Sequence, residues 1–469
     1  MEHPKPKQWE PLAWVPIVAG LFWLLAHAGL AWWFWALLPG CLLLASGIGL
    51  LMTPGDPRTV SLMAIGGALG LLFTLPAWIV ADFGTAALCA LLSAASCLAS
   101  GRTAVRRAPL HLGATPPEPS WQLDAKVALD EAILGYFVGS ARIPSGQAAV
   151  RTCEDSLRME DALHGRGWDR EPAAMHPAPP APDETYIERG RIYGRDFEVL
   201  RFDSAYMVPD ALPNAATWRG HADNAECHVR ILRHTGKPRP WLLCVHGYRM
   251  GSAWLDFSLF SPKWLHERLG LNIIQPVLPL HGPRSLGWRS GDQFLDGDLS
   301  DLIYAESQAL WDLRRTLAWL RASEPEARVG VYGISLGGYN AALLASYEAR
   351  LDFVVAAIPV VDLAHAIWSV APPAHRQFYA EHGLDEARYR SILQPVSPLA
   401  RPPLIASDRL FIIGATADRV CVPAHALALG KHWNVPVQWY QGSHLSIRHE
   451  HEVRDVLNLA IARAGWGVE

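Results

Sequence analysis

Three residues with the chemistry of a nucleophile, an acid and a base follow one another in the second half of the chain. Ser335 lies in Gly333-Ile334-Ser335-Leu336-Gly337, Asp418 in Gly414-Ala-Thr-Ala-Asp418-Arg-Val, and His444 in Gln441-Gly-Ser-His444-Leu. A serine hydroxyl becomes a nucleophile when a histidine removes its proton and a carboxylate orients that histidine. These residue types therefore predict acyl transfer to water, with Ser335 as the nucleophile, His444 as the general base and Asp418 as its partner.

The sequence around Ser335 has the form G-x-S-x-G, which by itself is weak evidence. A chain of this length contains such a motif by chance with a probability of roughly 0.1. Its context is stronger, because a strand is expected over 328–332 and a helix from Ser335 to about residue 348. Small residues let a strained turn between strand and helix expose the serine hydroxyl. The alternative is an ordinary turn in which the serine caps the helix.

Strand and helix patterns alternate along residues 186–469. Strands are expected at 187–202, 226–234, 240–245, 272–278, 328–332, 353–359, 409–414 and 436–440, and helices at 262–268, 301–322, 423–432 and from 450 onward. Short apolar strands that alternate with helices predict a mostly parallel sheet with helices on both faces. Ligands of such sheets bind at the carboxyl ends of the strands, where Ser335, Asp418 and His444 are expected.

With these three residues in the order nucleophile, acid and histidine, residues 186–469 resemble the α/β-hydrolase superfamily, in particular its esterase-like and lipase-like serine hydrolases. The resemblance implies the α/β-hydrolase fold, with a cap between strands 6 and 7 that covers about residues 363–407. It implies no metal and no cofactor. In some members the acid follows the preceding strand, so Asp362 remains the alternative to Asp418.

An oxyanion loop of this superfamily follows the third strand, with a helix, a strand and another helix before the nucleophile. His246-Gly247-Tyr248 leaves room for all three before Ser335, whereas His281-Gly282 leaves room for one clear helix. We therefore expect the backbone N–H groups of Tyr248 and Leu336 to bind the oxyanion, a contact worth about 3 kcal/mol of barrier for each donor.

Three further residues are candidates for substrate binding. His246 belongs to the expected oxyanion loop, and Arg284 follows a strand, where it is suited to an anionic group. Trp368 lies in the expected cap, whose aromatic residues indicate an apolar substrate or simply pack the cap. Arginines in such positions more often form ion pairs.

The N-terminal region has the composition of a membrane anchor. No charged residue occurs from Pro11 to Gly55, and the uncharged runs that follow predict four spans at 11–30, 33–53, 59–81 and 83–101 within a transmembrane region of residues 1–107. A cleaved signal peptide is the alternative, but the apolar sequence continues far beyond the Ala26-His27-Ala28 site that would be cut. The motif Gly66-x-x-x-Gly70 is typical of helix packing, either inside the bundle or in a homo-oligomer formed through the membrane helices.

Basic residues set the expected orientation of these spans. Lys5, Lys7, Arg58 and the arginines at 102, 106 and 107 fall on one side of a four-span bundle, which the positive-inside rule makes cytoplasmic. Residues 108–185 are expected to form a helical connector, with helices at 123–141 and 148–164 and a Pro-rich linker at 175–182. The hydrolase region at 186–469 would then also be cytoplasmic.

Composition excludes several classes of protein. The chain carries a net charge of −4, which provides no basic surface for nucleic acid, and its seven scattered cysteines form no C-x-x-C pair, which excludes a zinc finger and a disulfide scaffold. We expect a membrane-anchored serine hydrolase that cleaves carboxylic esters, with a lipid-like acyl ester as substrate and the lipid bilayer as partner. A serine peptidase of the same fold, or an inactive membrane scaffold, remains the alternative.

Overall fold

A computed structural model describes residues 10–467 of the chain. The chain divides into two compact units. The first unit comprises Met1–Ala141, Ala415–Pro423 and Trp439–Glu450, and the second comprises Arg142–Gly414, Ala424–Gln438 and His451–Glu469. Lys5 and Lys7, which contribute to the expected orientation, lie outside the described residues, so that orientation stays a prediction.

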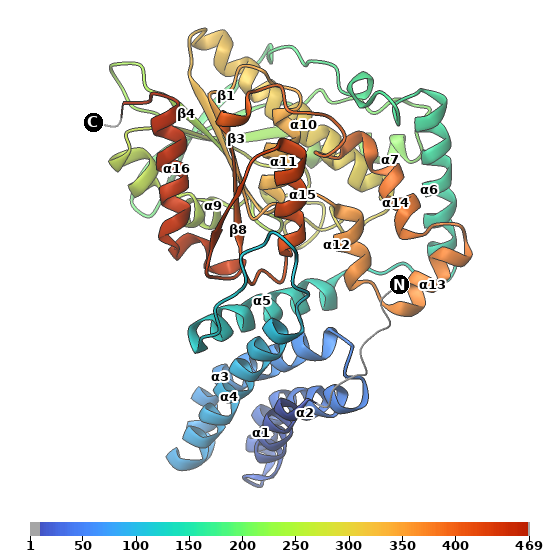
Figure 1. Ribbon diagram of the computed structural model, residues 1–469, viewed down its shortest axis with the longest axis vertical. Helices are drawn as coiled ribbons and strands as arrows, with labels where there is room; N and C mark the ends of the chain where they lie inside the picture. Colours follow the sequence, from blue (N-terminus) through green and yellow to red (C-terminus); the bar gives the residue numbers. More distant parts are fainter. Residues whose placement is uncertain (1–9, 468–469) are drawn as a thin grey trace. The chain divides into compact units, whose positions relative to one another are not determined.

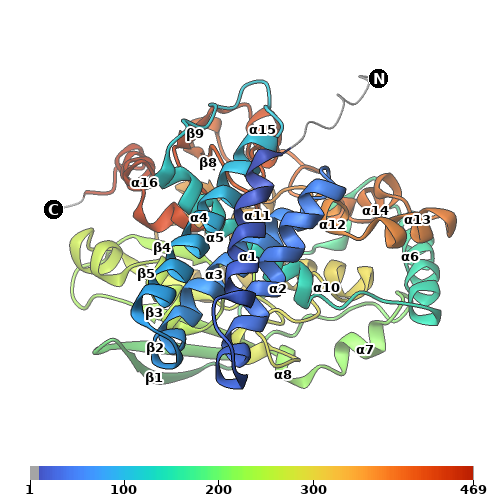
Figure 2. The same cartoon turned by 90° about the horizontal axis from the view of Figure 1, so that it is seen from below.

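The first unit begins with four apolar helices that lie side by side (Figure 2). They are α1 (Trp14–Leu25), α2 (Leu30–Met52), α3 (Arg58–Val80) and α4 (Phe83–Arg107). The last three are long and apolar enough to cross a membrane, whereas Pro11–Leu25 is a shorter apolar helix. The first helix ends at Leu25, before the expected limit at residue 30, and Gly29, with a φ of 114°, directly precedes α2.

Small residues allow these helices to approach closely. A side chain added at Gly66 would meet Leu43 of α2, and one added at Gly70 would meet Ser93 of α4. The Gly66-x-x-x-Gly70 motif is therefore used for packing inside the bundle. The outer surface of the bundle carries exposed large apolar side chains, among them Leu30, Phe34, Leu72, Ile79 and Phe83. Such a surface suits lipid rather than water.

The helix α5 (Trp121–Ser140) packs on α3 and α4 within the first unit. Glycines again permit the contact, because a side chain at Gly101 of α4 would lie 1.8 Å from the backbone oxygen of Asp124, and one at Gly135 would meet Ile65. The expected connector of residues 108–185 is thus divided, since α5 belongs to the first unit and α6 (Gln147–Gly165) to the second.

Nine strands form one sheet in the order β1-β2-β3-β5-β4-β6-β7-β8-β9. They are β1 (Tyr186–Ile192), β2 (Arg195–Asp203), β3 (Glu226–Leu232), β4 (Trp241–Val245), β5 (Asn272–Pro276), β6 (Val329–Ile334), β7 (Phe353–Ala357), β8 (Leu410–Ala415) and β9 (Val437–Tyr440). The single strand expected at 187–202 is a hairpin, because Tyr193 and Gly194 both adopt positive φ and turn the chain.

Helices cover both faces of the sheet, as the alternating pattern predicts. Figure 1 shows α9 (Ala253–Leu259) and α16 (His451–Arg463) on one face, and α10 (Leu299–Ser323), α11 (Leu336–Ala345) and α15 (Pro423–Trp433) on the other. A π-helical turn, Lys263–Arg268, stands where a helix was expected at 262–268, and the short helices α7 (Ala215–Arg219) and α8 (Ala222–Ala225) precede β3. The fold is that of an α/β-hydrolase.

The parallel register of the central strands determines which loops meet. Val245 at the end of β4 pairs with Gly333 of β6, and Gly333 pairs with Ala356 of β7. The loops after these strands therefore leave the sheet at the same edge, the carboxyl edge. The cap lies between β7 and β8. These are the sixth and seventh of the expected strands, because the first expected strand is divided into β1 and β2. The cap contains α12 (Leu363–Val370), α13 (Pro373–Glu381) and α14 (Glu386–Ile392).

Candidate active site

Ser335 occupies a strained turn between β6 and α11. Its φ of 60° and ψ of −118° lie outside the regions that a residue with a side chain normally adopts, at a cost of about 1–3 kcal/mol. Its N–H donates to the oxygen of Ala357 at 2.9 Å. The flanking glycines make the turn possible, because a side chain at Gly333 would lie 2.0 Å from the oxygen of Gly337, and one at Gly337 1.9 Å from that of Val245. This geometry is that of a nucleophile elbow and not of a simple helix cap.

The loop after β4 lies beside the elbow. A side chain added at Gly247 would come within 3.5 Å of the Ser335 Cβ. The rival loop packs against this loop, since the His281 ring lies 5.2 Å from that of His246 and a side chain at Gly282 would meet the backbone of Gly251, whereas no Ser335 atom is among the near neighbours of Gly282. Leu336 is the first residue of α11, where backbone N–H groups point out of the helix. This position suits the N–H of Leu336 to an oxyanion, whereas the same role for the N–H of Tyr248, which follows Gly247, stays a prediction.

His246 and Arg284 are structural residues, which corrects the expectation that they bind substrate. His246 is buried, with Nδ1 at 2.9 Å from the oxygen of Gly247 and Nε2 accepting the N–H of Leu278 at 3.0 Å. Arg284 is 0% exposed and forms an ion pair of 2.8 Å with Asp312. Both side chains are buried and have polar partners inside the protein, which does not suit them to substrate binding.

Trp368 packs the cap together. It is 8% exposed, and its ring centroid lies 5.2 Å from that of Tyr389 and 6.1 Å from that of Tyr379. The aromatic residues of this segment therefore form its own small core, which was the simpler of the two interpretations of its composition. A role of Trp368 in substrate binding stays a prediction.

The buried Asp418 and the partly buried His444 form a hydrogen-bonded pair in the first unit. Nδ1 of His444 lies 2.8 Å from Oδ2 of Asp418. The other oxygen, Oδ1, accepts the N–H groups of Val420 and Cys421 at 2.9 and 2.7 Å, which fixes the carboxylate. Burial by itself lowers the pKa of His444, but the Asp418 carboxylate outweighs it and holds that pKa well above 6.5. The Cys421 side chain also interacts with the imidazole.

Asp362, the alternative acid, has other partners. It caps α12 by accepting the N–H of His365 at 2.9 Å, and its second oxygen accepts from Arg390 Nε at 2.7 Å. These contacts are typical of a residue that fastens the cap, and they leave Asp418 as the better candidate.

Asp130 of α5 contacts the same two loops, and sequence reasoning missed it. Its buried carboxylate accepts the backbone N–H groups of Arg419, His444 and Leu445. A signal was available, because Asp130 lies three residues after Val127 and three before Ile133, on the apolar face of the expected helix. An acid on such a face needs partners.

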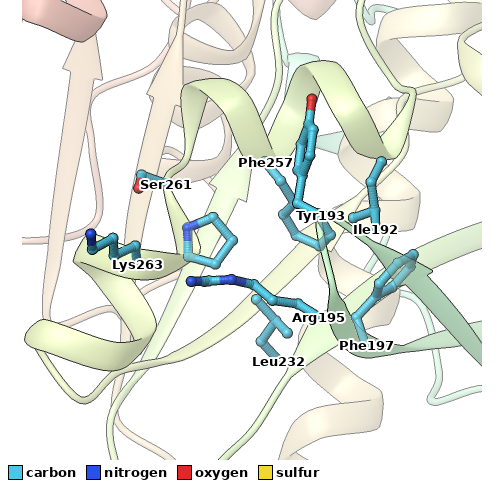
Figure 3. A pocket seen from close by; sticks show the side chains of 9 residues that line it. Ile192, Tyr193, Arg195, Phe197, Leu232, Phe257, Ser261 and Lys263 are labelled. Atoms are coloured by element: carbon cyan, nitrogen blue, oxygen red, sulfur yellow. The ribbon is translucent and has the colours of Figure 1, made fainter.

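Among residues 10–467, no group of three or more His, Cys, Asp or Glu side chains could hold a metal ion. Cys244 is buried within β4, and burial raises the pKa of its thiol. A pocket of about 230 Å³ lies between the β1–β2 hairpin and α9. Figure 3 shows Tyr193, Phe197 and Phe257 among its lining side chains, and none of the candidate site residues lines it.

Known proteins share parts of this chain. The model of the prolyl oligopeptidase family matches residues 320–449, which include Ser335, Asp418 and His444. Two uncharacterized proteins of Mycobacterium tuberculosis, from strains CDC 1551 / Oshkosh and ATCC 25618 / H37Rv, are 33% and 32% identical over 362 residues, or 76% of this chain and 87% of each relative.

Solved structures of two esterases also match the chain. The acetyl xylan esterase from Paenibacillus sp. R4 aligns with a TM-score of 0.43 and 17% identity over 62% of this chain and 94% of its own. Acetyl xylan esterase 1 from Thermoanaerobacterium sp. JW/SL YS485 aligns with a TM-score of 0.40 and 15% identity over 61% of this chain and 95% of its own.

Proposed function

Because this chain belongs to the α/β-hydrolase superfamily of serine hydrolases, in one family with the two mycobacterial proteins, we propose that it is a membrane-anchored hydrolase of carboxylic esters. Ser335, His444 and Asp418 are its proposed catalytic triad. The observation that carries the proposal is the strained backbone of Ser335, with a φ of 60° at the end of β6. A strained residue at the carboxyl edge of a sheet is typical of a nucleophile.

The proposed reaction has two steps. In the first, Nε2 of His444 takes the proton of Ser335 Oγ, which attacks the ester carbonyl, and the protonated histidine then donates to the leaving alcohol. In the second, water attacks the acyl-enzyme and the same proton transfers release the acid. Asp418 keeps the imidazole oriented and stabilises its charged form. The N–H groups of Tyr248 and Leu336 stabilise the oxyanion in both steps.

The membrane anchor supports a lipid-like acyl ester as the substrate class. The helices α2, α3 and α4 are long and apolar enough to cross a bilayer, so the hydrolase would be held close to lipids. In this proposal the bilayer is both the support of the enzyme and the source of its substrate. The hydrolase would lie on the cytoplasmic side, as the positive-inside rule predicts.

A peptidase is the second candidate, because the family model that matches residues 320–449 is that of the prolyl oligopeptidase family. A triad of this kind cleaves esters and amides by the same steps, so a substrate panel must distinguish them.

The experiment labels membrane fractions that contain the full chain with a fluorescent fluorophosphonate. We expect labelling of the native chain and none of Ser335→Ala or His444→Ala. Cys421→Ala is the matched control, because it removes a side chain that interacts with the imidazole but has no part in the proposed triad, and it should still be labelled. Absence of labelling in folded native protein would contradict the proposal and favour an inactive scaffold.

A panel of substrates then tests the substrate class. The native chain in detergent micelles is offered p-nitrophenyl esters of increasing chain length, a monoacylglycerol and a prolyl p-nitroanilide. We expect cleavage of the esters, fastest for the long acyl chains. Cleavage of the anilide alone would favour the peptidase, and a preference for short esters would contradict the lipid-like substrate.

A further inference from the structure

The carboxylate of Asp130 binds four donors from the two loops that carry the acid and the base of the proposed triad. Oδ2 accepts the N–H of His444 at 2.7 Å and that of Arg419 at 3.2 Å. Oδ1 accepts the Ser443 hydroxyl at 2.8 Å and the N–H of Leu445 at 3.0 Å. Three consecutive residues of the histidine loop, and the residue after Asp418, are therefore held by one side chain.

Four donors are what one ionised carboxylate can accept, because each oxygen offers about two lone pairs. Asp130 is 0% exposed, so bulk solvent does not compete for these contacts. A protonated acid would bring a hydrogen to a place where every neighbour already donates one. The arrangement therefore suits the charged form of Asp130 and no other.

This charge is placed at an electrostatic cost. Burial and the nearby Asp418 carboxylate raise the pKa of Asp130 to about 6, while His444 and the donated N–H groups oppose that shift. Two buried carboxylates near one imidazole destabilise a fold more than an apolar side chain would. A residue that serves folding alone would not need this cost, whereas a residue that fixes the geometry of the two loops would.

We propose that Asp130 is a positioning residue of the active site, which fixes the backbone of residues 443–445 and of Arg419 so that the His444 imidazole stays aligned on Asp418. The inference rests on the proposed function and adds to it a part of the site that comes from the helix α5, outside the hydrolase region of residues 186–469. Asp130 touches no reacting atom, and its effect passes through His444.

The neighbouring residue, Glu131, provides a matched control. It is also a buried carboxylate on α5, and it contacts the same loop, because its Oε1 accepts from Arg419 Nε at 2.7 Å. Its Oε2 accepts the hydroxyl of Ser61, on the apolar helix α3, at 2.7 Å. Glu131 thus ties the loop to the helices without bonding the backbone of the histidine loop, and its loss should affect stability more than catalysis.

The test compares Asp130→Asn with Glu131→Gln in the full chain, purified in detergent micelles, with a p-nitrophenyl ester as substrate. An asparagine has the shape of the aspartate, but in either orientation its NH₂ faces at least one backbone N–H of the loops. We expect kcat to fall about 100-fold, the cost of a small misplacement of a catalytic group, while KM changes less than about twofold. Glu131→Gln should keep kcat within about threefold of the native value.

A second variant covers the case in which Asp130→Asn does not fold. Ser443→Ala removes one of the four donors and leaves the three backbone contacts, and we expect it to lower kcat about threefold at unchanged KM. A partial loss of structure lowers the concentration of active enzyme and therefore the apparent kcat. Active-site titration with the fluorophosphonate corrects kcat for this loss, so a fall in kcat that remains at unchanged KM reports on the positioning of His444.

Each outcome decides the proposal. A titrated kcat of Asp130→Asn within twofold of the native value, an equal loss in Glu131→Gln, or a loss confined to KM would overturn it while the proposed function stands. If Asp130→Asn does not fold, an unchanged kcat of Ser443→Ala overturns it. A native chain that neither reacts with the fluorophosphonate nor cleaves esters overturns both the inference and the proposed function.

Discussion

The turn that carries Ser335 and the loops that carry Asp418 and His444 are held in different ways. Ser335 is fixed by its neighbours in sequence, since Gly333 and Gly337 leave the space that its strained backbone needs. The histidine loop is fixed from a distance, because the contact between Asp130 and the His444 N–H joins residues 314 positions apart. A local sequence motif thus fixes Ser335, whereas a tertiary contact fixes the loop of His444.

Two groups of buried charged side chains, one in each unit, also differ. In the second unit, Arg284 and Asp312 form a closed pair that the proposed chemistry does not use. In the first unit, Asp130 and Asp418 bring two carboxylates to one imidazole, an arrangement with an excess of negative charge. Structural pairs balance their charges, whereas perturbed groups of one sign gather where a function needs them.

The largest effect is expected from Asp418→Asn, which breaks the pair in the first unit. An amide offers a hydrogen to Nδ1 of His444 and favours the wrong tautomer, so Nε2 can no longer take the serine proton. We expect kcat to fall about 10⁴-fold, as in other triads of this type. Ester hydrolysis corrected by active-site titration measures it, and a loss below tenfold would favour Asp362 as the acid.

The same variant has a signature in the pH profile. The active base is the neutral imidazole, and the Asp418 carboxylate holds the pKa of His444 well above 6.5. In the native chain kcat/KM should therefore fall as the pH drops through a value above 6.5. Removal of the carboxylate lowers that pKa, so the residual activity of Asp418→Asn should persist to lower pH.

The next largest effect is expected from Gly337→Ala, which tests the strained turn at Ser335 in the second unit. The added Cβ would lie 1.9 Å from the backbone oxygen of Val245, so β4 and α11 must separate. We expect a loss of about 4 kcal/mol in the free energy of unfolding, at the upper end for single substitutions. Gly467→Ala is the control, because a Cβ there meets nothing within 4 Å. Equal thermal stability of the two variants would contradict the described turn.

A smaller effect is expected from Arg284→Met, which unpairs the buried charge of the second unit. The Asp312 carboxylate would remain buried without its 2.8 Å partner, at a cost of about 3 kcal/mol in stability. KM and titrated kcat should not change, because Arg284 is 0% exposed. A rise in KM with an anionic ester and none with a neutral one would restore Arg284 as a substrate-binding residue.

The smallest effect is expected from Ser61→Ala on α3. It removes one hydrogen bond to Glu131, which keeps its ion pair of 2.7 Å with Arg419. We expect a loss of about 1 kcal/mol in stability, seen as a slightly lower Tm in micelles, with kcat unchanged. A clear loss of kcat would show that the contact of α3 with α5 positions the site, as we propose for Asp130 alone.

Features that depend on a short stretch of sequence could be predicted. The apolar runs predict the helices α2 to α4, and the alternation of strands and helices predicts the sheet from β3 to β9 to within a few residues. The exceptions are local: the hairpin turn at Tyr193 and Gly194 divides one expected strand, and the first helix ends at Leu25, short of the expected limit. The elbow was readable as well, since its glycines stand within two positions of Ser335.

The residue types with the chemistry of a triad, the strained turn and the apolar helices follow from near neighbours in the chain, so they can be predicted from the amino-acid sequence. The burial and pairing of Arg284 and His246, and the contacts of Asp130 with the loops of Asp418 and His444, become visible only in the folded structure. Burial and partners depend on what the rest of the chain packs against a side chain. An Asp on a helix looks the same in sequence whether it faces water or four hydrogen-bond donors.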